Sequence, residues 1–163
     1  MLDLSSTRKR VELQGFRNLT DEEIAGINYG LRVAPAICML WGAIGTGLAS
    51  PLILLSLAPF ALMGAVFPSH PFDIVYRSWL QERIHGKPLP PYPFPRRMAC
   101  VSATFMITAA SAAMLLGRPG IGLAFGATMT AAAGLNVLTG ICVPPLLMRL
   151  LATMRANLAS ARR

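Results

Sequence analysis

Residues 33–67 read VAPAICMLWGAIGTGLASPLILLSLAPFALMGAVF, and no charged side chain occurs between Arg32 and Asp73. An α-helix rises about 1.5 Å per residue, so about 20 apolar residues cross the hydrocarbon core of a bilayer. This stretch is therefore long enough for two crossings. Two further stretches without charge, residues 98–117 and 119–148, are separated by a single arginine. The sequence predicts four membrane-spanning helices.

The composition supports one membrane domain. Of the 163 residues, 54% are hydrophobic and 13% are charged, against about 25% charged in an average soluble domain. A soluble helical protein of this composition would lack the polar surface needed to cover its apolar segments. We therefore predict an all-α integral membrane protein whose four transmembrane helices form two hairpins. The predicted spans lie at about residues 31–48, 51–67, 98–116 and 121–140.

The spans divide the chain into a central domain and two tails. Residues 1–19 are polar and basic without a hydrophobic period, so we expect a disordered N-terminal tail. Thr20 and Glu23 then fit a capping box that starts a helix. Residues 20–158 form the predicted single four-helix membrane domain, and residues 159–163 form a basic C-terminal tail.

Basic side chains gather on one side of the predicted membrane. The net charge is +8, and all but one of the 15 lysines and arginines lie before the first span, in the central segment or after the last span. The exception is Arg118, in the turn between the last two spans. By the positive-inside rule both termini and the central segment are cytoplasmic. The charges also suit the anionic inner leaflet, so we expect no nucleic-acid partner.

Two segments outside the spans have the pattern of cytoplasmic interfacial amphipathic helices, at residues 72–85 and 146–158. Aromatic rings and arginines in and near these segments are of the types that hold a helix at the membrane surface. The predicted interfacial anchors are Tyr76, Arg77, Trp79, Arg96, Arg97 and Arg149.

Small residues recur at every fourth position of the last span and predict close helix packing. They are Gly122, Gly126, Thr130 and Gly134, which include a GxxxG pair. An oligomer contact is one interpretation of this ridge. We favour packing within the chain, because the alanine-rich third span is joined to the last span by a short turn.

The cysteines Cys38, Cys100 and Cys142 form no CxxC motif and no paired metal-binding spacing. A buried reduced cysteine usually behaves as a small hydrophobic residue, and we favour that interpretation. Cys100 opens the third span and Cys142 follows the fourth, so an antiparallel hairpin would bring both to the cytoplasmic edge. Arg96 and Arg97 would favour a thiolate there. Cys100 and Cys142 are therefore a possible thiol site.

No histidine, aspartate, glutamate or lysine lies inside a predicted span, which argues against an ion pump or an ion-coupled transporter. His70 and His85 lie in the central connector, where we expect them to titrate as surface groups. A structural metal site needs about four ligands, and two histidines do not supply them. We expect no catalytic residue, no metal and no cofactor.

Three short motifs resemble a bacterial family of small polytopic membrane proteins that is catalogued as a domain of unknown function. They are Pro71-Phe72-Asp73 with Tyr76-Arg77, Pro95-Arg96-Arg97, and Gly140-Ile141-Cys142-Val143-Pro144 with Met148-Arg149. The resemblance covers about residues 28–151. It implies a multi-pass protein of the bacterial inner membrane. Family members often carry a second cysteine shortly after the one matching Cys142, where this chain has prolines.

Two functions of different classes follow. The first is a non-catalytic accessory or scaffold subunit of a larger inner-membrane complex, with the bilayer and other membrane subunits as partners. Spans rich in small residues and free of ionisable groups favour it. The alternative is a thiol-dependent membrane protein for redox or sulfur chemistry that uses Cys142 and Cys100.

Overall fold

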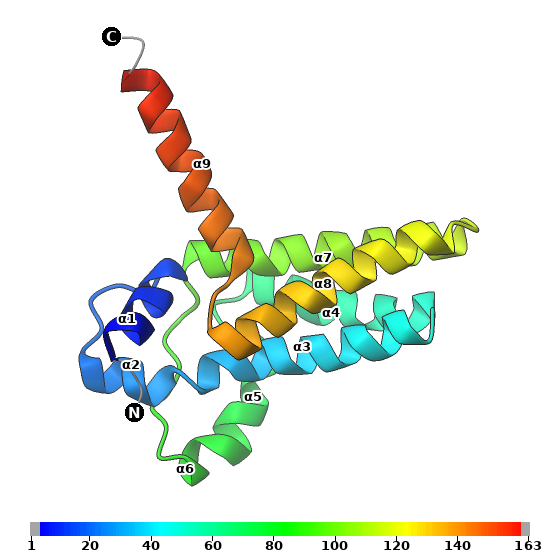
Figure 1. Cartoon of the computed structure of the whole chain (residues 1–163). Coiled ribbons are helices and arrows are strands. Elements are labelled where there is room, and N and C mark those ends of the chain that lie inside the picture. The colour runs from blue at the N-terminus through cyan, green and yellow to red at the C-terminus, as the bar shows by residue number, and fades with distance from the viewer. Residues whose placement is uncertain (1–3, 161–163) are drawn as a thin grey trace.

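The computed structural model describes residues 4–160 of the chain, and every regular element in this part is helical (Figure 1). In chain order the elements are α1 (Leu4–Leu13), α2 (Asp21–Ile27), α3 (Gly30–Gly47), α4 (Pro51–Val66), α5 (Asp73–Val75), the π-helical turn η1 (Tyr76–Leu80), α6 (Gln81–Arg83), α7 (Phe94–Leu115), α8 (Pro119–Thr139) and α9 (Val143–Ser160).

Three segments are long and apolar enough to cross a membrane: Asp21–Gly47, which contains α2 and α3, Phe94–Leu115 and Pro119–Thr139. At most 33% of the residues in the apolar part of each segment are buried within the chain, so most of that apolar surface faces outward. This is the pattern of a membrane protein, because lipid covers what a soluble fold would have to bury. α4 is also apolar but has only 16 residues.

Two helical hairpins lie side by side. α3 pairs with α4 and α7 pairs with α8, while α4 packs along α7 and α3 packs along α8. The two short turns lie at one end of this bundle, and α1, α2, α5 and α6 gather at the other (Figure 1). α9 leaves the bundle at that second end and projects away from it, in a direction transverse to the long axis of the bundle (Figure 1). Leu54, Leu57, Ile107 and Ala110 are fully buried between the hairpins.

Local signals fix several helix ends. Thr20 and Glu23 form the predicted capping box at the start of α2. Ser50 caps α4 by accepting a hydrogen bond from the Ile53 N–H, and Pro51 occupies the first helical position. Gly140 ends α8 with a φ of 71°, the left-handed conformation that glycine adopts without strain.

The ridge of small residues on α8 contacts two helices. Gly122 faces α7, because a Cβ atom at this position would clash with the Met114 side chain and lie 2.7 Å from the Ala110 carbonyl oxygen. The other three residues face α3: Gly126 meets Thr46, Thr130 meets Gly42 and Gly134 meets Met39. The ridge was expected to pack against the third predicted span, which corresponds to α7. Instead, α8 begins against α7 and leans onto α3 along its length.

The N-terminal segment is helical where sequence analysis expected a disordered tail. Val11 of α1 and the following Phe16 are buried against Ile24 and Ile27 of α2. Only a few apolar residues make this contact, so the segment has no hydrophobic period that sequence analysis could detect. Residues 1–3 lie outside the described residues, as do residues 161–163 of the predicted C-terminal tail.

Two predicted interfacial anchors are buried inside the protein. Tyr76 is 0% exposed and donates a hydrogen bond to the Lys87 carbonyl oxygen at 2.9 Å. Arg96 is 4% exposed. The amphipathic pattern placed both at the membrane surface, but the segments that precede α3 and α7 fold over them.

The other four predicted anchors reach the surface. Trp79 is exposed with the Arg83 guanidinium over its ring, and Arg77 is exposed beside it. Arg97 donates to the Ala65 carbonyl oxygen at the end of α4, and Arg149 donates to the Glu12 carbonyl oxygen at the end of α1. Cations at these positions satisfy helix carbonyls that lack an intrahelical partner.

Replacing Gly122 with alanine should destabilise the hairpin of α7 and α8. The new methyl group meets a backbone carbonyl that cannot move aside, and overpacking of this kind costs about 1–3 kcal/mol. Gly120→Ala is the matched control, because no atom lies within 4 Å of a Cβ there. Thermal unfolding in detergent should show a lower midpoint for Gly122→Ala alone. Equal midpoints for both variants would contradict the close contact.

Candidate functional site

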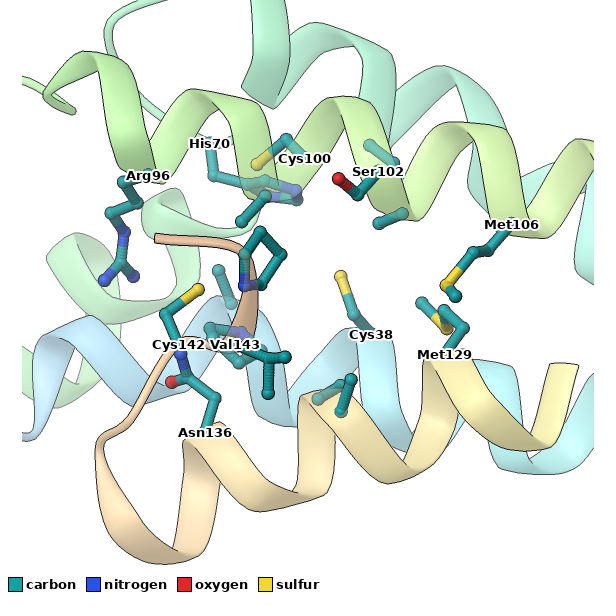
Figure 2. Close-up of a pocket in the computed structure, with 18 of the residues that line it drawn as sticks. Cys38, His70, Arg96, Cys100, Ser102, Met106, Met129, Asn136, Cys142 and Val143 are labelled. Carbon is teal, nitrogen blue, oxygen red and sulfur yellow. The ribbon is translucent and has the colours of Figure 1, made fainter. Parts of the chain in front are cut away.

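A cavity of about 130 Å³ lies between α7 and α8 where the two helices diverge, at the end of the bundle that carries α1 and α9. Helices α3, α7 and α8 and the connection between α8 and α9 form its walls. Alanines make up much of the lining. The lining side chains that carry sulfur or a polar group are Cys38, His70, Tyr92, Arg96, Cys100, Ser102, Met106, Met129, Asn136 and Cys142 (Figure 2).

All three cysteines of the chain line this cavity. Cys38 comes from α3, Cys100 from α7 and Cys142 from the connection after α8, and all three are free thiols. Figure 2 shows their sulfur atoms pointing into the cavity. Cys100 is close enough to both of the others for electrostatic interaction. The structure therefore brings the predicted pair, Cys100 and Cys142, to one cavity and adds Cys38.

Arg96 carries a buried positive charge at the same end of the cavity. Its guanidinium donates to the Leu31 carbonyl oxygen at 2.6 Å, to the Gln14 side-chain oxygen and to the Tyr92 hydroxyl oxygen. It also lies over the Tyr92 ring, 4.4 Å from its centre. No carboxylate in residues 4–160 forms an ion pair with it. Its charge acts on Cys142, where it favours the thiolate.

A second buried group, Asp73, is linked to Arg96 through Tyr92. The Tyr92 hydroxyl donates to one Asp73 oxygen at 2.9 Å, and the other oxygen accepts the His70 N–H at 2.9 Å. Burial raises the pKa of Asp73, while these hydrogen bonds and the charge of Arg96 oppose the rise. Asp73 thus fixes the backbone at His70.

His70 presents a hydrogen-bond donor to the cavity. Its Nδ1 accepts the Phe72 N–H at 3.2 Å, so the proton of the neutral ring sits on Nε2. Burial, together with the charge of Arg96, lowers the pKa of His70 to about 4. The ring lies against Gly64, where a Cβ atom would be 3.1 Å from both His70 Nε2 and Cys100 Sγ. These two atoms are therefore separated by no more than twice that distance.

Asn136 supplies the opposite group, an unpartnered acceptor. Its side chain is 5% exposed, and its Oδ1 has no hydrogen-bond partner among the described residues. The same side chain forms a hydrogen bond with the Cys142 thiol. Burial raises the pKa of Cys142, while Arg96 and this hydrogen bond lower it. The cavity therefore holds an unpartnered acceptor, Asn136 Oδ1, beside one thiol and the Nε2 donor of His70 near another.

The fold and the site define a helical protein with three segments long and apolar enough to cross a membrane and a buried cavity of thiols. A family model described as Domain of unknown function (DUF4395) matches residues 28–153, and the chain belongs to that family. This confirms the predicted resemblance. No curated protein and no solved structure matches the chain. No group of three or more histidine, cysteine, aspartate or glutamate side chains in residues 4–160 is arranged to hold a metal ion.

Sequence reasoning missed His70, Asn136 and Cys38 as members of the site. His70 was expected at the surface, and the structure buries it. Asn136 is the one amide inside a predicted span, and polar groups at such positions often mark functional sites, so it could have been found from the sequence. Cys38 gave no signal, because its distance from Cys100 depends on how α3 and α7 pack.

Protonation of His70 should destabilise the protein in acid. An unfolded histidine has a pKa of 6.5, so between pH 6.5 and about 4 the unfolded chain binds a proton that the folded chain rejects. Stability should therefore fall as the pH drops through this window, by about 3 kcal/mol in total. Unfolding midpoints in detergent at several pH values measure this effect.

His70→Gln should remove most of that acid sensitivity. His85→Asn is the control, because His85 is exposed and asparagine tolerates its φ of 49°. Asp73 is present in both variants, so its own titration contributes to each curve. Identical pH profiles for His70→Gln and the unaltered protein would refute a buried neutral His70.

Proposed function

We propose that the protein performs thiol-dependent redox or sulfur chemistry in a membrane, with Cys100 and Cys142 as its working thiols. One observation carries the proposal: cysteines from three separate parts of the chain meet at one cavity with a buried arginine and a neutral histidine. A scaffold has no need of that arrangement. The accessory-subunit hypothesis, with other membrane proteins as partners, stays a prediction.

Cys142 is the proposed attacking thiol. It lies between helices rather than inside one. Burial raises the pKa of its thiol, and Arg96 and Asn136 offset part of that rise. Cys100 is the proposed second thiol, next to the Nε2 proton of His70. A pair of thiols can pass through a mixed disulfide with a substrate and resolve it by forming their own disulfide.

We further propose four spans, α3, α4, α7 and α8, in a bacterial inner membrane with both termini in the cytoplasm. α4 is about 24 Å long at 1.5 Å per residue, and it lies along the full-length helix α7. The basic residues of α1, of the connector before α7 and of α9 lie at the end of the bundle that carries α9, which supports a cytoplasmic side there. The thiol cavity would then open near the cytoplasmic leaflet.

α9 is the proposed interfacial helix of this arrangement. Leu147, Leu151, Met154 and Leu158 are exposed along it, and so are Arg149 and Arg155. A helix with exposed apolar and basic side chains binds at the surface of an anionic leaflet. Its course across the bundle axis in Figure 1 suits a position in the plane of the membrane.

Reporter fusions test the orientation. Fusions at Ser50 and Pro119, in or beside the two short turns, should read outside, because only one basic residue lies in these turns. Fusions at Lys87 and after Arg163 should read inside. A cytoplasmic signal from either short turn would refute the four-span topology.

Labelling in isolated membranes tests the thiols. At neutral pH a membrane-permeant maleimide should modify Cys142 several times faster than Cys38, because Arg96 and Asn136 offset part of the rise that burial causes in the pKa of Cys142, and Cys38 lies inside α3. Mass spectrometry of proteolytic fragments measures each rate. In a strain that lacks the gene, the Cys142→Ala variant should fail to reverse the phenotype of the deletion. The Cys38→Ala variant should reverse it and is the matched control. Equal, slow labelling of all three cysteines, or a working cysteine-free protein, would leave only a packing role.

A further inference from the structure

We propose that the cavity receives the ring of a membrane-soluble quinone, which accepts two electrons from Cys100 and Cys142. This inference rests on the proposed thiol function and names its substrate class. The size of the cavity, its chemistry, the unpartnered Asn136 Oδ1 and the Nε2 proton of His70 support it.

The cavity has the size and lining that an apolar ring requires. Its volume is about 130 Å³, and an apolar protein cavity of about 150 Å³ holds a benzene molecule. Alanines and the thioethers of Met106 and Met129 line it, and sulfur makes favourable contacts with aromatic rings. Its walls include α3, α7 and α8, which belong to the three membrane-crossing segments. A ligand dissolved in the hydrocarbon phase can therefore reach it, with any tail left in the lipid.

The free donor and the free acceptor match the two redox forms of a quinone. A quinone carbonyl oxygen accepts hydrogen bonds, and His70 offers its Nε2 proton because Nδ1 is already bonded to Phe72. A hydroquinone hydroxyl donates, and Asn136 Oδ1 is a buried acceptor without a partner. An oxyanion such as sulfate would need several donors and would be repelled by Asn136 Oδ1. The cavity therefore favours a ring with two oxygen atoms over an inorganic anion.

The electron balance is complete with the quinone as oxidant. The Cys100 and Cys142 thiols lose two electrons and two protons and form one S–S bond. The quinone gains two electrons and two protons and becomes a hydroquinone. The Arg96 charge offsets part of the rise that burial causes in the pKa of Cys142, which helps the thiol to lose its proton before the transfer. A cytoplasmic dithiol then restores the two thiols by thiol–disulfide exchange and is itself oxidised.

The test is anaerobic reduction of tetramethyl-1,4-benzoquinone, a fully substituted quinone without a tail, by the purified, prereduced full chain in lipid nanodiscs. A fully substituted ring is used because thiols cannot add to it. Absorbance should show one hydroquinone formed per chain, and mass spectrometry should show a disulfide between Cys100 and Cys142. Cys100→Ser and Cys142→Ser should each abolish both signals, while Ser56→Ala, which lies exposed on α4 outside the cavity, should retain them. Cys38→Ser serves only for comparison of unfolding midpoints.

Variants of the cavity test how the ring is held. Asn136→Leu and His70→Leu should each lower the rate of quinone reduction about tenfold, the effect of one hydrogen bond. His70→Gln keeps an N–H donor and should recover most of the rate. Thr128→Ala is the matched control, because Thr128 is exposed outside the cavity and its hydroxyl already bonds the Ala124 carbonyl oxygen. Equal rates for Asn136→Leu, His70→Leu and Thr128→Ala would overturn the proposed ring position.

The thiol function and the quinone can fail separately. If maleimide labels Cys142 rapidly but no hydroquinone forms, the thiol proposal stands and the quinone is refuted. If Cys142 is unreactive and no hydroquinone forms, both are refuted. A loss of signal in Cys100→Ser counts only where its unfolding midpoint matches that of Cys38→Ser, and Cys100→Ala provides a second variant for the same measurement.

Discussion

The buried guanidinium of Arg96 holds together five parts of the chain. It donates to Gln14 after α1, to the Leu31 carbonyl oxygen in α3 and to Tyr92 in the connector, and Gln14 in turn donates to the Gly140 carbonyl oxygen after α8. A buried charge that loses such partners costs several kcal/mol. The segments that satisfy Arg96 must therefore stay in place, and they enclose one end of the cavity.

The path of α8 makes room for that cavity. Gly122 allows α8 to touch the α7 backbone near the short turn, and Gly134 lets its other end approach α3 instead. The widening gap between α7 and α8 is lined by side chains too small to close it, alanines above all. Close packing at one end of a hairpin thus produces an opening at the other. Arg96 and Cys142 lie at that opening.

The polar groups of the cavity are held by neighbours that do not line it. Asp73 accepts the His70 N–H, and Phe72 occupies Nδ1, so the His70 ring has one tautomer and one free proton. The absence of a side chain at Gly64 lets that ring lie beside Cys100. The site therefore depends on hydrogen bonds within the connector as much as on the helices. That is why the connector is folded and largely buried at Phe72, Asp73 and Tyr76.

The sequence by itself determined the helical class, the apolar helices, the capping box at Thr20, and the family. Each depends on a run length or on residues within a few positions of one another. Only the tertiary structure decided that Tyr76 and Arg96 are buried, because an amphipathic pattern separates a polar from an apolar face without saying what covers either. The meeting of Cys38 with Cys100 was likewise decided by the tertiary structure. It depends on how α3, α7 and α8 are rotated and tilted against one another, and that geometry comes from contacts between residues far apart in the chain.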